Sequence, residues 1–105
     1  MAASYDPQEA VARFVEHHQL GTSVEARTLD LVSEVGEVAK EVLKGSAYGR
    51  EPFVPTDAWA DELGDTLFSL LYVANGTGVN LKVALQTAMK KYERRIALQG
   101  DLGST

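Results

Sequence analysis

Glycine and proline divide this chain into a few helical segments and leave room for only one long loop. Residues 45–56 contain two glycines and two prolines, so they cannot form a continuous helix, and Gly45 is expected to end the preceding helix in a left-handed conformation. Helix-start signals at Asp6-Pro7, Thr22-Ser23, Thr56-Asp57 and Asn80 predict helices over about residues 7–20, 24–44, 57–75 and 81–98. No segment alternates apolar and polar residues over more than a few positions, which argues against strands. We therefore predict one all-α domain over residues 1–105, with a four-helix-bundle-like architecture.

Charge and composition exclude several classes of function. The chain has 15 acidic and 10 basic residues and a net charge of -5, which argues against a protein that binds a nucleic acid polymer. It has no cysteine, so disulfides, thiolate catalysis and thiolate metal sites are excluded. No run approaches the roughly 18 apolar residues of a membrane span, and the N-terminal residues do not resemble a signal peptide. We expect a cytoplasmic protein with no membrane partner.

Acidic residues form a stripe on the segment predicted as the second helix. At 100° per residue, Asp30, Glu37 and Glu41 all lie within about 60° of Glu34. An apolar stripe runs directly beside them, so the acids border the expected core instead of facing away from it. Lys40 lies outside the acidic stripe, and like charges at this spacing repel one another.

The segment predicted as the third helix repeats this pattern. Glu62 and Asp65 are three residues apart and point the same way, and Ser69 continues their line. Each acidic pair has a glycine within it, Gly36 or Gly64, and a glycine inside a helix predicts close approach of a neighbouring group. A single such pair would be read as solvated surface charge, whereas two pairs beside two apolar seams favour a shared site.

If the two apolar seams pack together, four carboxylates converge and require a cation. The predicted metal ligands are Glu34, Glu37, Glu62 and Asp65. Carboxylates held this close cannot all stay ionised unaided. Ligation by oxygen alone, without histidine or cysteine, favours Mg²⁺, with Mn²⁺ as the alternative.

Residues 31–41 and 61–71, separated by the Gly- and Pro-rich loop, resemble the MazG-type nucleotide pyrophosphohydrolases. The shared pattern is Glu-x-x-Glu, a variable gap, and Glu-x-x-Asp, and the resemblance extends from Leu29 to Ile96. The MazG-type enzymes belong to an all-α superfamily that also contains dimeric dUTPases and phosphoribosyl-ATP pyrophosphatase. The resemblance implies metal-dependent hydrolysis of nucleoside triphosphates, NTP or dNTP, to the monophosphate and pyrophosphate by a homodimer or homotetramer.

Candidate roles for individual residues follow from this chemistry and this resemblance. Glu34 and Glu37 are the candidate catalytic residues, with Glu34 as the general base that orients a metal-bound water. Lys91 and Arg95 are four residues apart and would cradle the pyrophosphate, although their spacing fits a solvated basic helix end equally well. The resemblance favours Lys91 as a functional residue. Two further candidate substrate contacts are Asn80, whose first reading is a helix cap, and Ser69.

Three alternatives stay open at the level of sequence. The substrate class could instead be that of a dUTPase-like enzyme or of phosphoribosyl-ATP pyrophosphohydrolase. The chain could also be a non-catalytic helical module for protein association. Self-association of the chain is expected in each case. The segment predicted as the third helix is apolar nearly all round, and one small bundle does not cover that apolar surface.

Overall fold

The computed structural model describes residues 5–99, and within that range it contains four helices and no strand. The helices are α1 (Pro7–His17), α2 (Val24–Gly45), α3 (Trp59–Gly76) and α4 (Leu81–Gln99). The all-α prediction is confirmed. None of these helices is both long and apolar enough to cross a lipid bilayer.

Side-chain caps at the N-termini explain where three of the helices begin. Asp6 accepts a hydrogen bond from the backbone N–H of Gln8, and Ser23 accepts one from Ala26. Asn80 accepts one from the backbone N–H of Val83 in the first turn of α4. These bonds satisfy backbone donors that a helix N-terminus leaves without partners. The polar residues at these positions in the sequence therefore set the three helix starts.

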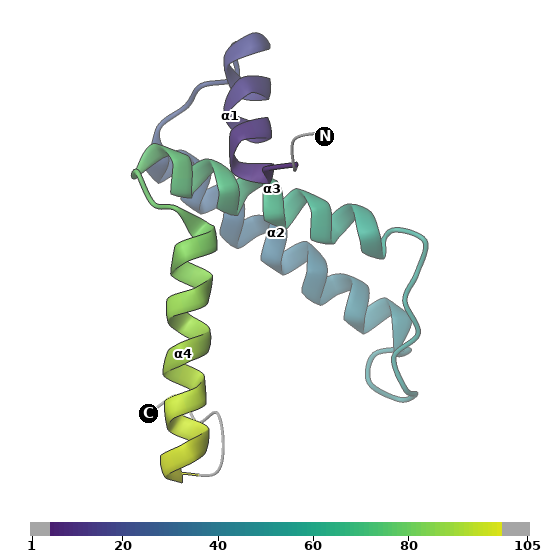
Figure 1. Ribbon diagram of the computed structural model, residues 1–105. Helices are drawn as coiled ribbons and strands as arrows, with labels where there is room; N and C mark the ends of the chain where they lie inside the picture. The colour runs from purple at the N-terminus through teal and green to yellow at the C-terminus, as the bar shows by residue number, and fades with distance from the viewer. Residues whose placement is uncertain (1–4, 100–105) are drawn as a thin grey trace.

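Helices α2 and α3 lie side by side and antiparallel, and α1 crosses the far end of this pair (Figure 1). Side-chain hydrogen bonds fasten α1 and the loop after it to α3. The side chain of Asn75 donates to the carbonyl of Gln8 at 2.9 Å, and that of Gln8 donates to the side chain of Asn75 at 3.1 Å. The hydroxyl of Tyr72 donates to the carbonyl of Thr22 at 2.7 Å. The α2–α3 pair is thus anchored at the end opposite the long loop.

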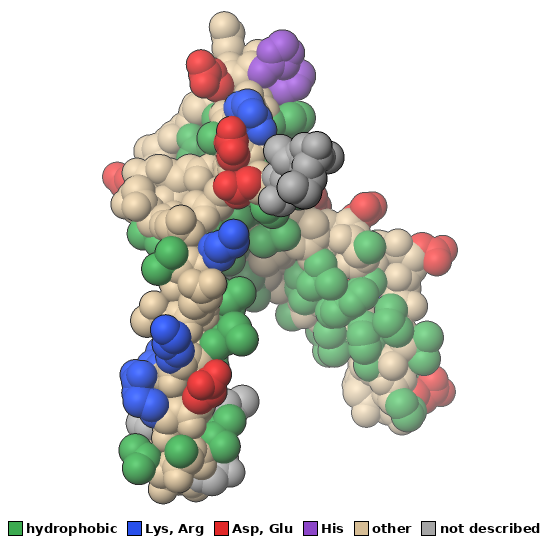
Figure 2. Space-filling view, viewed as in Figure 1, with side chains coloured by type: hydrophobic (Ala, Val, Ile, Leu, Met, Phe, Trp, Pro, Cys, Tyr) green, Lys and Arg blue, Asp and Glu red, His purple; other side chains and the backbone are tan. Residues whose placement is uncertain are grey.

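Helix α4 extends away from the other three helices and leaves the chain without a closed bundle (Figure 1). Among the described residues, the only buried hydrophobic side chains are Leu71 and Ala74, both on α3. Large apolar side chains on α2, α3 and α4 stay exposed instead; examples are Leu29, Val32, Leu67, Leu85, Met89 and Ile96. Figure 2 shows hydrophobic side chains on the surface of the α2–α3 pair and on α4, with Lys and Arg side chains grouped on the lower half of α4. A single copy therefore buries too little apolar surface for a typical domain core.

The glycines take roles different from those expected. Gly45 is the last residue of α2 and is not left-handed; the left-handed residues are Ala47, Tyr48 and Gly49, just beyond it. The carbonyl of Val54 and the ring of Phe53 pack against Gly45 where a side chain would otherwise lie. The expectation of a left-handed stop at Gly45 was therefore wrong, because the returning loop needs a residue without a side chain there.

The close approach expected at Gly36 and Gly64 is also not found within the chain. Among residues 5–99, no group beyond the glycine's own helix backbone and chain neighbours lies within 4 Å of the position that a Cβ would occupy on either glycine. Both glycines instead leave open surface beside the acidic residues of α2 and α3.

Candidate metal centre

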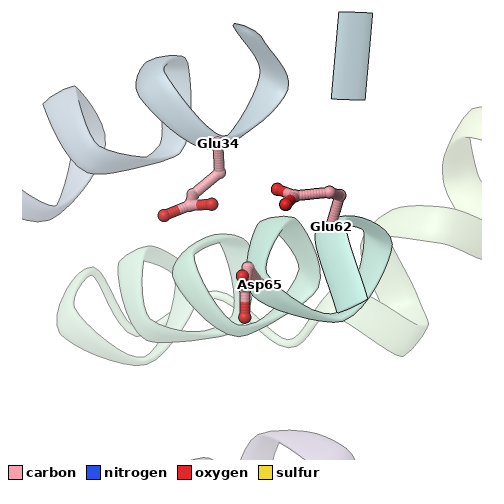
Figure 3. A group of neighbouring side chains, drawn as sticks. All are labelled: Glu34, Glu62 and Asp65. Atoms are coloured by element: carbon pink, nitrogen blue, oxygen red, sulfur yellow. The ribbon is translucent and has the colours of Figure 1, made fainter. Parts of the chain in front are cut away.

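Three of the four predicted ligands come together between α2 and α3. Glu34 on α2 and Glu62 and Asp65 on α3 each offer one carboxylate oxygen, and these oxygens lie within 4.8 Å of one another. In Figure 3 the side chain of Glu34 extends from α2 toward α3, and that of Glu62 extends from α3 into the space between the two helices. Glu34 and Glu62 are half-buried, whereas Asp65 is exposed. The antiparallel packing thus brings together residues that lie about 30 positions apart in sequence.

The electrostatics of this group favour a bound cation. Burial raises the pKa of the Glu62 carboxyl above the ordinary glutamate value, and the negative charges of its acidic neighbours add to this shift. In order of effect these neighbours are Glu37, Asp65, Glu34 and Glu41. Among the described residues, no hydrogen bond or ion pair links a protein donor to Glu34, Glu62 or Asp65. An all-oxygen donor set with unneutralised charge fits a hard divalent cation.

Glu37, the fourth predicted ligand, lies outside the group that the structure forms. One of its carboxylate oxygens is 3.8 Å from the Nζ of Lys40, and both side chains are about half exposed or more. Lys40 was expected to lie outside the acidic stripe, but its flexible side chain reaches back to Glu37. Exposed pairs of this kind contribute about 0–1 kcal/mol, so this contact holds Glu37 only weakly.

Of the candidate substrate contacts, Ser69 lies on α3 and Asn80 lies just before α4. Ser69 is on α3 one turn after Asp65 and is only 3% exposed. The side-chain oxygen of Asn80 is used as the cap of α4, as the first reading of this residue predicted. A nucleotide contact by either residue stays a prediction.

Lys91 and Arg95 are separated from the carboxylates of their own chain. Both lie on α4, which points away from the α2–α3 pair (Figures 1 and 2). Their cationic groups lie 5.3 and 6.0 Å from the ring centre of Tyr92, which holds the two side chains on one flank of the helix. Helix α4 carries five basic residues (Lys82, Lys90, Lys91, Arg94 and Arg95) and only Glu93 as an acid.

The described hollows of the chain do not include the metal centre. A hollow of about 370 Å³ lies between α1, α3 and the start of α2, and Val15, Thr22, Tyr72 and Asn75 are among the residues that line it. No carboxylate of the acidic group contributes to its lining.

Arg27 is a residue near this surface that the sequence analysis did not single out. Its guanidinium carbon lies 4.7 Å from the ring centre of Tyr72 and 5.7 Å from that of Phe68, between α2 and α3. It also pairs with Asp30 at 3.4 Å. Arg27 precedes Glu34 by seven residues, a spacing that places both on one face of α2. This spacing could have identified Arg27 as a residue near the acidic stripe.

Comparison with known proteins assigns the family. Residues 22–97 match the MazG nucleotide pyrophosphohydrolase domain, which is well over half of the chain. The chain is a member of this family. The matched segment of this MazG domain contains the three grouped carboxylates, Glu37, and the basic residues of α4.

A curated relative is similar over most of the chain. It is the uncharacterized protein YpjD of Bacillus subtilis (strain 168), which is 33% identical over 94 residues, or 86% of this chain and 83% of its own length. No solved structure matches this MazG domain significantly.

Proposed function

We propose that this MazG domain hydrolyses nucleoside triphosphates, NTP or dNTP, to the nucleoside monophosphate and pyrophosphate. The observation that supports this proposal is the group formed by Glu34, Glu62 and Asp65. These carboxylates lie within a matched pyrophosphohydrolase domain, and no lysine or arginine among residues 5–99 forms an ion pair with them. Phosphoryl chemistry depends mainly on positioning and charge stabilisation, so the site needs no nucleophilic side chain.

The metal proposed for the site is Mg²⁺, with Mn²⁺ as a substitute. Glu34, Glu62 and Asp65 would hold it, and Glu37 would join them by leaving its weak pair with Lys40. When bound, such an ion would neutralise charge on the triphosphate as the bond between the α and β phosphates breaks, and it would acidify a water molecule. Glu34 is proposed to orient that water and accept its proton.

The proposed phosphate-binding residues are Lys91 and Arg95, and we propose that they reach the site from a second copy of the chain. In one copy they lie on α4, away from the carboxylates (Figure 1). Helix α4 is basic, the surface around Glu34 and Glu62 is acidic, and both carry exposed apolar side chains beside the charged ones. Docking α4 of one copy near α2 and α3 of another would cover apolar surface and bring opposite charges together, in a homodimer or a homotetramer.

The nucleotide preference is best measured directly. A panel of NTPs, dNTPs, dUTP and phosphoribosyl-ATP, assayed with and without Mg²⁺, separates the proposed activity from its close alternatives. We expect metal-dependent formation of monophosphate and pyrophosphate in equal amounts. Strong preference for dUTP or for phosphoribosyl-ATP would reassign the substrate class.

A matched pair of variants tests whether the carboxylate group carries the activity. Asp65→Ala removes a grouped carboxylate, whereas Asp61→Asn removes an exposed charge four residues earlier on α3. We expect the first to abolish pyrophosphate release and the second to retain it. Equal activity in Asp65→Ala and the wild type would contradict the assignment, and a lack of metal-dependent turnover by the wild type on the whole panel would favour the association module.

A further inference from the structure

Glu41 is a buried charged residue next to the metal centre, and both of its oxygens are engaged by protein groups. It is only 5% exposed and lies on α2 seven residues after Glu34, two turns along the same face. One oxygen accepts a hydrogen bond of 2.5 Å from the hydroxyl of Thr56. The other lies 3.4 Å from the Nζ of Lys44. The Thr56 hydrogen bond is the main cause that lowers the pKa of Glu41, so this carboxylate stays ionised.

These contacts distinguish Glu41 from the three grouped carboxylates. The oxygens of Glu34, Glu62 and Asp65 are free of protein donors among the described residues, whereas those of Glu41 are already taken. Glu41 is thus tied to protein groups and does not belong to the group of converging oxygens. Its contact with Thr56 instead joins α2 to the loop that leads into α3.

The loop of residues 46–58 folds back over the last turn of α2. The backbone N–H of Val54 donates to the carbonyl of Gly45 at 2.9 Å, and the ring of Phe53 packs on Gly45. The same ring lies 5.0 Å from the ring of Trp59, the first residue of α3. Thr56, which donates to Glu41, lies in sequence between Phe53 and Trp59.

Helix α3 begins without a side-chain cap, which increases the importance of this bond. The N-cap residue is Ala58, which makes no side-chain hydrogen bond. Thr56 lies two residues before this N-cap and donates its hydroxyl hydrogen to Glu41. The start of α3 is therefore fastened to α2 and not to its own first turn. Glu62 follows Thr56 by only six residues, within the first turns of α3.

We propose that Glu41 is a positioning residue that holds the start of α3 against α2 through Thr56 and so sets the separation between Glu34 and Glu62. The inference rests on the proposed metal-dependent function. Residues that orient metal ligands typically change metal affinity by about 10–100-fold when they are altered. The Glu41–Thr56 contact acts on the whole first segment of α3, since a helix moves largely as a rigid body.

Titration with Mn²⁺ alone, followed by electron paramagnetic resonance, tests this role without turnover. Thr56→Val keeps the shape of the side chain but removes its hydroxyl, and we expect it to weaken Mn²⁺ binding about 10-fold or more. Thr56→Ser restores a hydroxyl and should bind within about threefold of the wild type. Glu41→Gln keeps an oxygen that can accept the Thr56 hydrogen bond, so it should also bind much more tightly than Thr56→Val.

The outcomes separate this inference from the proposed function. Wild-type affinity in Thr56→Val would overturn the proposed role of the Thr56 hydrogen bond. A large loss only in Glu41→Gln would show that the charge of Glu41 matters and that its hydrogen bond to Thr56 does not. Failure of the wild type to bind Mn²⁺ would overturn the metal site itself. Thermal unfolding with and without Mn²⁺ provides a second readout, because a bond that is merely structural would lower both melting temperatures equally and leave the Mn²⁺-induced shift unchanged.

Discussion

Glu34 on α2 and Glu62 on α3 bring carboxylate oxygens within 4.8 Å of each other across two antiparallel helices. Asp65 adds a third carboxylate to the same space, and burial together with these charges raises the pKa of Glu62. Without a cation this arrangement is unfavourable, because like charges at this distance repel and are partly removed from water. The helix pair therefore holds a local instability that a divalent ion would remove.

Added metal is expected to stabilise the folded protein through these carboxylates. A ligand that binds only the native state at 100 times its dissociation constant stabilises by about 2.7 kcal/mol, which corresponds to roughly 10–20 °C in a domain of this size. We expect Mg²⁺ or Mn²⁺ to raise the melting temperature of the wild type and of Asp61→Asn, but not that of Asp65→Ala. Differential scanning fluorimetry with a chelator as the baseline measures this, and an equal rise in all three proteins would contradict it.

The raised pKa of Glu62 predicts how the stability of the metal-free protein depends on pH. Because the folded state binds this proton more tightly than the unfolded state, the carboxyl favours folding at low pH, and that contribution is lost as the pH rises through the raised pKa. Glu62→Gln should therefore raise the melting temperature of the metal-free protein at neutral pH. The difference from the wild type should shrink as the pH falls toward the ordinary glutamate range, since a protonated Glu62 resembles glutamine.

A control at the other acidic pair strengthens this measurement. Glu37→Gln removes one of the neighbouring charges that contribute to the pKa shift of Glu62, so it should give a smaller effect in the same direction. If Glu62→Gln instead lowers the melting temperature of the metal-free protein at neutral pH, repulsion between the ionised carboxylates does not destabilise the folded state.

Glu37 is expected to matter for turnover even though it lies outside the grouped oxygens. Glu37→Gln should lower metal-dependent pyrophosphate release by about 100-fold or more, since even residues outside the ligand shell contribute about 10–100-fold. Lys40→Ala removes only its surface partner and should leave the rate at or slightly above that of the wild type. A loss in Lys40→Ala as large as that in Glu37→Gln would indicate that the ion pair is the functional unit.

Local signals in the sequence predict much of this fold. Asp6, Ser23 and Asn80 act as caps because each side chain reaches a backbone donor a few residues ahead, a relationship that does not depend on the rest of the molecule. Helical spacing predicted that Glu34, Glu37, Glu62 and Asp65 border a shared seam, because helical periodicity fixes which residues share a face. In the structure, Glu34, Glu62 and Asp65 come together and Glu37 lies outside their group.

Features that depend on contacts between distant segments were harder to predict. Thr56 belongs to a helix-start signal in the sequence, but only the folded loop brings Glu41 within reach of its hydroxyl hydrogen. Gly45 fits a helix stop, yet its role is set by Phe53 and Val54 packing on it. The direction of α4 after Asn80 is likewise not encoded in any local spacing.

The position of α4 leads to a prediction about how two copies share one site. Each copy should supply its carboxylates to one site and its α4 cations to another, so two different inactive variants can rescue each other. Asp65→Ala mixed with Lys91→Ala, after exchange of subunits, should recover about a quarter of the wild-type activity if copies pair at random in a symmetric dimer. Neither variant alone should approach that level.

Controls on assembly complete this test. Met89 is 51% exposed on α4, and Met89→Glu would place a charge on the apolar face proposed to meet the second copy. We expect this variant to sediment as a smaller species than the wild type and to abolish the rescue when it is built into both partners. Exposed Lys82→Ala, on the first turn of the same helix, should preserve both assembly and rescue. A lack of rescue between variants that do form mixed oligomers would indicate that each chain completes its own site, because the carboxylates and the cations would then have to come from the same copy.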